Sequence, residues 1–261
     1  MNLAEMSCAL GFVAMRMKAF VIHLERASGR RPQAEFLRAT LPPPAELLPA
    51  VDGLQLSDAD VRGVFRPALH RPHYPFTLSR TEVACFLSHR RAWQAIVEED
   101  LDAALVVEDD VAIEEQAFGE VLAAALDGLV PEEFVRFPFR DRGEQGQVVR
   151  AAGSARLIEP RMPGLNMQMQ LVGREAARRL LWASEIFDRP VDTYVQMRWL
   201  HGVRVLTARP IVIREIGADL GGSVIHARRP GLVHKVVHEV RRPFIRLAMH
   251  RANERWRRRA A

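Results

Sequence analysis

The stretch that most constrains the fold is an apolar run that ends in three acids. Residues 103–107 are all apolar, and Glu108, Asp109 and Asp110 follow them directly. A short, valine-rich run bounded by polar residues predicts a strand buried in a parallel sheet. Ligands of open α/β sheets bind beyond the carboxyl ends of such strands. Repulsion among the three acids favours a bound Mg²⁺ or Mn²⁺ ion, but an acidic turn that caps the next helix explains the same residues equally well.

Length and composition indicate one large α/β domain with an appendage. The chain has 261 residues, of which 48% are hydrophobic and 26% charged, as in ordinary globular proteins. Two cysteines, Cys8 and Cys85, are too few for a disulfide framework, and no apolar run is long enough to span a bilayer. The apolar run at residues 8–15 lacks the positive start of a secretory signal, so we expect residues 1–16 to be a peripheral extension.

The basic charge is concentrated at the C-terminus. Residues 227–261 contain eleven Lys and Arg against two acids, whereas the first 226 residues have a net charge of −4. The acidic body argues against nucleic-acid binding. Residues 226–261 are predicted to be a basic amphipathic tail of two helices, separated at Pro243, that lies on an anionic membrane. Packing of the tail on its own domain is the alternative.

Strands and helices alternate through the first half of the chain and are more mixed in the second half, within one domain over residues 17–225. A capping box of the form Ser-x-x-Glu at residues 79–82 predicts a helix that runs to about Asp100. Ser57 could cap a shorter helical turn. Strands are expected at residues 18–24, 47–51, 103–107, 134–137, 155–159, 167–172, 203–207 and 211–213, and other helices at 32–39, 118–126, from 173 and from 190.

Two groups of polar residues are candidates for ligand binding. His23, Arg26, Arg30 and Arg31 lie at the end of the first predicted strand and in the loop after it. Arginine forks suit diphosphate oxygens, although a solvated basic helix start is the simpler interpretation. No G-x-G-x-x-G or Walker motif is present. Within the capped helix, His89 after Ser88 has the features of a structural histidine, and Cys85 those of a small core residue.

Several blocks occur together in one order and spacing. They are residues 21–26 with Arg30 and Arg31, residues 50–53, residues 82–89 with Trp93, residues 108–111, residues 170–181 and residues 190–192. In these blocks, over about residues 17–225, the chain resembles glycosyltransferase family 25, the bacterial lipooligosaccharide and lipopolysaccharide sugar transferases, which includes the collagen galactosyltransferases. It departs from the family pattern at His23, where Asn is usual, and at Thr81 and Ala84, where Gly is usual.

The resemblance implies an α/β fold of GT-A type, a nucleotide-binding sandwich with a mixed central sheet that uses a UDP-sugar. Asp110 and Glu108 are then the ligands of Mn²⁺ or Mg²⁺, which neutralises charge on the leaving UDP. The donor-binding residues implied are His23, Leu24, Arg26, Arg30, Arg31, Ser88, His89, Glu108 and Asp109.

The family is expected to invert the anomeric centre, which requires one general base. Asp192 is our candidate, although it could instead be the N-cap of a helix over residues 193–200. Glu215 competes for the same role, and His226 is a further candidate metal ligand.

The function expected from the resemblance is transfer of a hexose, usually galactose in this family, to a lipid-linked saccharide such as lipooligosaccharide. Such an enzyme acts in the cytoplasm, peripherally bound to the inner face of the cell membrane. A family member that has lost catalysis and serves as a binding or adhesion-type protein is the alternative. The intact triplet at residues 108–110 favours the enzyme.

Overall fold

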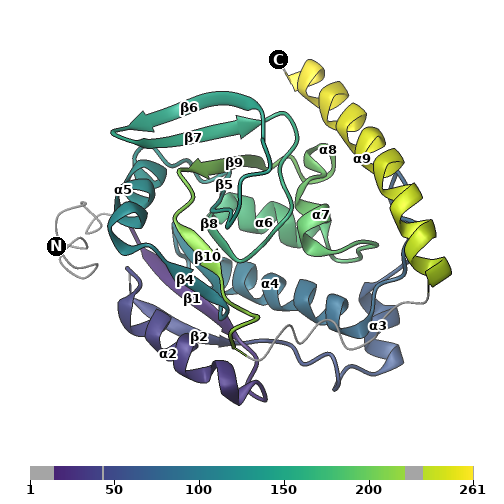
Figure 1. Ribbon diagram of the computed structural model, residues 1–261, viewed down its shortest axis with the longest axis horizontal. Helices are drawn as coiled ribbons and strands as arrows, with labels where there is room; N and C mark the ends of the chain where they lie inside the picture. The colour runs from purple at the N-terminus through teal and green to yellow at the C-terminus, as the bar shows by residue number, and fades with distance from the viewer. Residues whose placement is uncertain (1–14, 43, 221–231, 261) are drawn as a thin grey trace.

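The computed structural model describes residues 15–42, 44–220 and 232–260, with the side chains of 232–242 and 260 left out. Its centre is one eight-stranded sheet in the order β2-β1-β3-β8-β5-β9-β7-β6 (Figure 1). The strands are β1 (Met17–His23), β2 (Ala45–Pro49), β3 (Ala103–Glu108), β5 (Glu133–Arg136), β6 (Gly146–Ala152), β7 (Ala155–Pro160), β8 (Met169–Gly173) and β9 (Arg204–Arg209).

The sheet is mixed, as predicted. Strand β1 pairs in parallel with β2 on one side and with β3 on the other. Strand β8 then runs antiparallel to both β3 and β5, β9 is parallel to β5, and β7 and β6 complete the sheet as an antiparallel hairpin. The parallel part therefore places the carboxyl ends of β1, β2 and β3 along one edge of the sheet.

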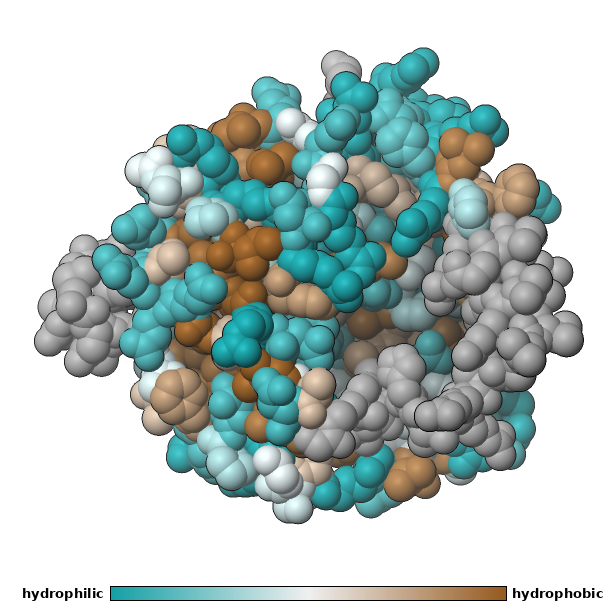
Figure 2. All heavy atoms as spheres, in the orientation of Figure 1, coloured by the Kyte–Doolittle hydropathy of each residue, from teal (hydrophilic) through white to brown (hydrophobic). Residues whose placement is uncertain are grey.

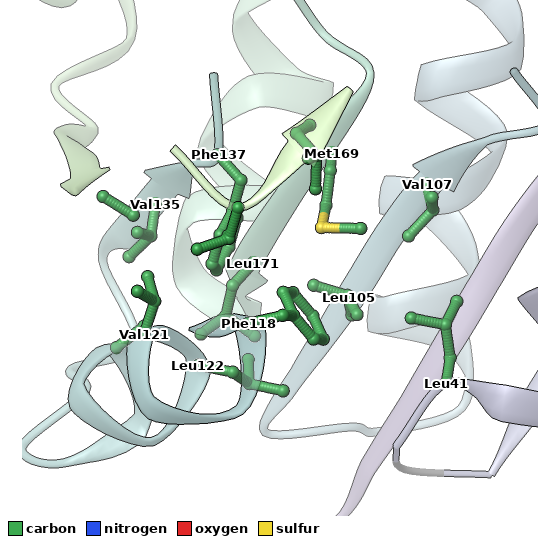
Figure 3. Close-up of a cluster of buried hydrophobic side chains, with 14 of the residues drawn as sticks. Leu41, Leu105, Val107, Phe118, Val121, Leu122, Val135, Phe137, Met169 and Leu171 are labelled. Atoms are coloured by element: carbon green, nitrogen blue, oxygen red, sulfur yellow. The ribbon is translucent and has the colours of Figure 1, made fainter. Parts of the chain in front are cut away.

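Helices cover both faces of the sheet (Figure 1). Helices α2 (Arg31–Thr40) and α5 (Glu115–Leu126) pack on one face, where Leu105 and Val107 of β3 belong to the same buried cluster as Phe118 (Figure 3). Helices α4 (Arg80–Glu98), α6 (Arg174–Ala183) and α7 (Val191–Val195) pack on the other face, against Ala104 and Val106. Successive residues of β3 thus point to opposite layers.

The two predicted N-caps are both present. Ser79 begins α4, and its hydroxyl accepts the N–H of Glu82 while the Glu82 carboxylate accepts the N–H of Ser79. Ser57 begins α3 (Asp58–Val64) through the same reciprocal pair with Asp60. Each box satisfies N–H groups that have no partner within the helix, so the sequence alone determines where these helices start.

Two short pairings were not predicted. Strand β6 is largely exposed and has a bulge between Val148 and Arg150, so its sequence lacks the apolar signal of a buried strand. Strand β4 (Val111–Ile113) pairs antiparallel with β10 (Ile213–Glu215), which starts two residues later than the expected strand. This second sheet brings Glu215 to the region after β3.

The predicted break of the C-terminal tail at Pro243 is wrong. Helix α9 (Leu232–Ala260) is continuous through Pro243, which costs one backbone hydrogen bond. One face of the turns that follow packs against the domain: Met249 is 1% exposed, and Asn253 accepts a hydrogen bond from Arg198 Nε at 2.9 Å. Arg198 belongs to α8 (Arg198–His201). In the described part of the chain, no helix is long and apolar enough to cross a bilayer.

Candidate functional site

A cleft lies at the carboxyl ends of β1, β2 and β3 and is closed on one side by α4. The space-filling view shows this face of the molecule hollowed over α4 (Figure 2). Most of the residues predicted for the donor site come together here. The lining residues are Ile22, Leu24, Arg26, Ala27, Arg30, Ala50, Val51, Gly53, Thr81, Ala84, Cys85, Ser88, His89, Glu108, Asp109 and Asp110.

The three consecutive acids do not point the same way. Glu108 follows the even-numbered side chains of β3 toward α4, where one of its oxygens lies 3.0 Å from His89 Nε2. Asp109 is directed to the opposite layer, and its Oδ2 lies 2.7 Å from Nδ1 of His23, which is 2% exposed. The period of two residues in an extended chain accounts for this separation. His23 therefore lies behind Asp109 and holds it.

Arg30 lies between Asp109 and Asp110. It ends a single 3-10 turn, Ser28–Arg30, in the loop after β1. Its Nη1 donates to Asp109 Oδ1 at 3.0 Å and to Asp110 Oδ2 at 3.1 Å. One guanidinium thus joins two carboxylates from the end of the neighbouring strand.

Asp110 is the least compensated of the three acids. Burial raises its pKa to about 7, the charges of Glu108, Asp109 and Glu215 add to this effect, and Arg30 opposes it. Its Oδ1 is buried and has no hydrogen-bond partner among the described residues. A carboxylate in this state favours either a proton or an additional cation, so the arrangement fits a divalent metal.

The turn after β10 forms a further wall beside Asp110. The N–H of Ile216 donates to the backbone carbonyl of Asp110 at 2.8 Å. A Cβ atom on Gly217 would lie 2.8 Å from Glu215 Oε1 and 3.1 Å from Asp110 Oδ2, so a side chain there would displace the acids. Glu215 is therefore a neighbour of the triplet. His226 lies outside the described residues.

The two arginines that flank residues 27–29 differ from their neighbour Arg31. Arg26 lines the cleft and is fixed by a hydrogen bond from its Nε to Asp52 Oδ2 at 2.8 Å. The structure does not bring Arg31 into the cleft: its side chain is 52% exposed and pairs with Glu35 one turn along α2. Of the three arginines predicted to bind the donor, two line the site.

The departures from Gly at residues 81 and 84 are accommodated. Thr81 and Ala84 line the cleft, and the close backbone approach is made from the other side by Gly53. A Cβ on Gly53 would lie 2.9 Å from the Thr81 Cα. Ser88 links the same elements, because its hydroxyl accepts the N–H of Val51 at 2.9 Å. Its role in this structure is to attach the chain after β2 to α4.

Asp192, the predicted base, is not among the cleft-lining residues, but it is electrostatically close to them. It lies in the first turn of α7, whose N-cap is Pro190, so Asp192 is not the N-cap. Its Oδ1 accepts the N–H of Thr193 at 2.6 Å. Burial raises the pKa of Asp192, hydrogen bonds from Thr193 and the charge of Arg136 lower it, and Glu108 adds to the rise.

Cys85 is a cleft residue that sequence reasoning assigned to the core. It is half-buried on the face of α4 that also carries His89, one turn further along. Burial raises the pKa of the thiol well above its usual value, and Glu108, Asp192 and Asp110 contribute to the rise. The spacing of four residues between Cys85 and His89 is the signal that could have placed both side chains on one face.

Known proteins are similar to this chain in the region that contains most of the cleft-lining residues. Residues 16–142 match the family described as glycosyltransferase family 25 (LPS biosynthesis protein). A glycosyltransferase 25 family member of Drosophila melanogaster is 36% identical over 100 residues, which cover 37% of this chain and 16% of the relative. Human procollagen galactosyltransferase 2 is 32% identical over 115 residues, which cover 42% of this chain and 18% of the relative. The mouse inactive glycosyltransferase 25 family member 3 is 29% identical over 219 residues, covering 75% and 36%.

The chain spans only about a sixth of the length of the first two relatives. Among solved structures it is similar to A197 from STIV with a TM-score of 0.36 and 17% identity, over 74% of this chain and 81% of that one, which is too low to define the fold. The family match and the named relatives agree with the motifs that line the cleft. Residues 16–142 therefore belong to glycosyltransferase family 25, as the sequence resemblance predicted.

Proposed function

We propose that the protein is a metal-dependent, inverting glycosyltransferase with a GT-A type fold that transfers a hexose from a UDP-sugar. The observation that carries the proposal is the cleft at the ends of β1 and β3. Arg26 and Arg30 line it together with Asp110, whose buried Oδ1 has no hydrogen-bond partner among the described residues. A nucleoside diphosphate needs cationic partners, and its metal needs a hard oxygen ligand. Both kinds of group are present in one cavity.

Asp110 and Glu108 would hold the metal, Mn²⁺ or Mg²⁺. Burial raises the pKa of Asp110 and the neighbouring acids add to the rise, so an added cation would stabilise the ionised carboxylate. When bound, the ion would supply positive charge to the leaving diphosphate. Asp109 is already engaged by His23 and Arg30, so its role would be to orient Arg30 rather than to bind the ion.

The remaining donor-site residues have separable tasks. Arg26 and Arg30 would bind diphosphate oxygens, and Leu24 offers an apolar contact on the same wall. Ser88 and His89 would shape the site. Ser88 accepts a hydrogen bond from the N–H of Val51, and His89 pairs with the Glu108 carboxylate. Arg31 is not assigned to the donor, since it pairs with Glu35.

Asp192 would be the general base that takes the proton from the acceptor hydroxyl. Its burial raises the pKa toward the range in which a carboxylate accepts a proton efficiently near neutral pH. Glu215 is the alternative base, because it lies beside Asp110. Substituting each by its amide separates the two, since loss of the base lowers kcat and leaves donor affinity nearly unchanged.

We infer galactose as the sugar and a lipid-linked saccharide such as lipooligosaccharide as the acceptor. The relative named procollagen galactosyltransferase and the family description that mentions LPS biosynthesis support these two assignments. An acceptor of this kind lies in a membrane, which agrees with a cytoplasmic protein bound to the inner face through α9. On that helix, Phe244 is 70% exposed and Leu247 is 48% exposed, near Arg251.

Calorimetry with UDP tests the donor site. Binding should be tighter with Mn²⁺ than without it, and Asp110→Asn should remove the metal-dependent part. Arg31→Gln is the matched surface control and should behave as wild type. UDP binding that ignores both the metal and the substitution would contradict the proposal. A screen of nucleotide sugars for UDP release with crude lipooligosaccharide then identifies the sugar.

Sedimentation with anionic liposomes tests the membrane contact. Phe244→Glu should reduce the bound fraction, because it places charge where an apolar side chain enters the interface. Trp182→Glu is the control, since Trp182 is a 75% exposed aromatic residue on α6. Equal sedimentation of the wild type and Phe244→Glu would exclude docking through this part of α9.

The second candidate is a binding protein without catalysis. It is favoured by the relatives that cover 75% of this chain, which are named inactive or probably inactive family members. Arg30 also neutralises part of the acidic cluster without any metal. UDP binding without UDP release, across the whole panel of nucleotide sugars and acceptors, would select this candidate.

A further inference from the structure

Cys85, His89 and Glu108 form a cluster that the proposed function does not use as a unit. One possible ligand atom from each side chain lies within 4.8 Å of the other two. In the described part of the chain, no other group of three His, Cys, Asp or Glu side chains satisfies this condition. The cluster joins one face of α4 to the end of β3.

The local chemistry favours a cation of borderline-soft character. Thiolate, imidazole and carboxylate are together the ligands of zinc, whereas Mn²⁺ and Mg²⁺ prefer oxygen. Burial raises the pKa of the Cys85 thiol, and the negative charges of Glu108, Asp192 and Asp110 add to the rise, so the thiol is protonated in the free protein. A divalent ion reverses this balance, because it binds the thiolate and releases the proton to the solvent.

His89 presents one ring nitrogen to the cluster. Its side chain is 1% exposed, and its Nε2 lies 3.0 Å from a Glu108 oxygen, so Nε2 is the atom that the ring offers to an ion. The other nitrogen, Nδ1, is directed away from Glu108; it is buried and has no hydrogen-bond partner among the described residues. In the ion-bound form Nδ1 would carry the proton, which leaves the lone pair of Nε2 for the ion.

The geometry leaves room for an ion and one exchangeable ligand. Donor atoms around a tetrahedral zinc ion lie roughly 3–4 Å apart, so the three side chains need to close by about one to two ångströms at most. All three residues line the cleft, which leaves the fourth position open to the solvent or to a bound molecule. Three protein ligands and one open position are typical of accessible zinc sites.

We propose that Cys85, His89 and Glu108 bind a zinc-class transition-metal ion in the wall of the cleft. The inference goes beyond the proposed function and is independent of it, since a chain without transferase activity would bind the ion at the same residues. Occupancy draws Glu108 toward α4 and away from Asp110. Zinc is therefore expected to compete with the Mn²⁺ of the donor site for this carboxylate.

The test is a titration of the full, metal-free chain with Co²⁺, which reports thiolate ligation through a charge-transfer band in the near ultraviolet. The wild type should show the band at one ion per chain, and Zn²⁺ should displace it. Cys85→Ser should abolish the band. Cys85→Ser and His89→Gln should each weaken Zn²⁺ binding by at least roughly 10- to 100-fold, which is the loss expected even for an outer-shell partner of a ligand. Cys8→Ser, which removes the chain's other cysteine, should behave as wild type.

Two measurements keep the test decisive if a variant folds poorly. Circular dichroism establishes the fold of each variant, and Zn²⁺ should protect Cys85 of the wild type from alkylation. A band that persists in Cys85→Ser, or wild-type Zn²⁺ affinity in both ligand variants, would overturn the proposal. Alkylation of Cys85 at the same rate with and without Zn²⁺ would also overturn it. Manganese-dependent UDP binding is measured separately, so failure of one proposal leaves the other standing.

Discussion

Two groups of buried charges in this protein are built in opposite ways. Asp188 and Arg189 are both fully buried, and the Arg189 Nε donates to the Asp188 carboxylate at 2.7 Å. The surrounding backbone completes the pair: Asp188 accepts the N–H of His70, and Arg189 donates to the carbonyl of Pro72. In the cleft, Arg30 is shared between Asp109 and Asp110, and one oxygen of Asp110 has no partner among the described residues.

The difference separates a structural pair from a site with unused binding capacity. In the first group one acid meets one base, and hydrogen bonds from the chain satisfy the remaining atoms. In the second group the acids outnumber the nearby base; burial raises the pKa of Asp110, and the charges of the other acids add to the rise. A network whose polar atoms are all paired has no atom available to bind a ligand. A network with an unpaired carboxylate oxygen is stabilised when a cation binds to it.

Breaking the closed pair should have the largest effect on stability. Asp188→Asn leaves the guanidinium of Arg189 buried without a counter-ion, which costs about 3–5 kcal/mol. Urea unfolding at pH 7 measures the change in the free energy of unfolding. Glu35→Gln is the control: its partners are exposed, and we expect a far smaller loss of stability than from Asp188→Asn. Equal effects of the two substitutions would contradict the distinction.

Removing the charge of Asp110 from the acidic cluster in the cleft should instead increase the stability of the metal-free protein. A carboxyl whose pKa is raised on folding stabilises the fold below its unfolded pKa of 3.8, and this contribution is lost as the pH rises through about 7. The metal-free wild type should therefore lose stability over this range relative to Asp110→Asn. We expect the variant to be more stable by about 3 kcal/mol at pH 8 and by little at pH 4.

Urea unfolding of both proteins at pH 4, 6 and 8 checks this difference. Mn²⁺ should then raise the melting temperature of the wild type at pH 8 but not that of Asp110→Asn. The prediction fails if Asp110→Asn is less stable than the metal-free wild type at pH 8.

A fully satisfied histidine should set the acid side of the stability profile. In His201, Nδ1 accepts the N–H of Val203 and Nε2 lies 3.1 Å from the carbonyl of Val195, so the ring is neutral. Burial lowers its pKa to about 4. Its contribution to stability is present above pH 6.5 and is lost as the pH falls toward 4.

Between pH 7.5 and pH 5 this loss amounts to about 2 kcal/mol. The Gln side chain of His201→Gln does not titrate, so this variant should not show that loss between pH 7.5 and pH 5. Urea unfolding at the two pH values compares the proteins. Identical pH dependence would show that His201 does not remain neutral.

The smallest effect should separate two neighbouring arginines. Arg30 lies between the acids, whereas Arg31 pairs with Glu35 outside the cleft. Arg30→Gln should weaken UDP binding about tenfold, or about 1.4 kcal/mol, while Arg31→Gln should change it less than about twofold. Calorimetry in the presence of Mn²⁺ measures both. Equal weakening by the two substitutions would mean that net charge, and not position, determines affinity.

Much of the fold follows from local chemistry. The capping boxes at Ser57 and Ser79 and the buried run of β3 are determined by residues close in the sequence, and the structure agrees with each. Strand β6 and the continuous helix through Pro243 were missed, because the local sequence of each lacks a signal for the structure that it adopts. An exposed hairpin strand lacks a periodic signal, and a proline in a helix is tolerated when later turns are held by packing.

The sequence predicted which residues line the site better than how those residues are arranged in it. The loop after β1, the helix with Ser88 and His89, and the acidic triplet were all expected to meet, and they line one cleft. That Glu108 and Asp109 face opposite layers follows from the strand period, and this could have been inferred. The position of Glu215 beside Asp110 could not, since it depends on the unpredicted pairing of β10 with β4.

The order of the strands also bears on self-association. Among the described residues, the eight-stranded sheet ends at β2 on one side and at β6 on the other, and unpaired edges invite strand addition from other molecules. Strand β2 ends in Pro49, which has no N–H to donate, and β6 has its bulge next to the charged Arg150. Both edges are thereby poor templates for another chain, so the sheet can keep its open form without promoting aggregation.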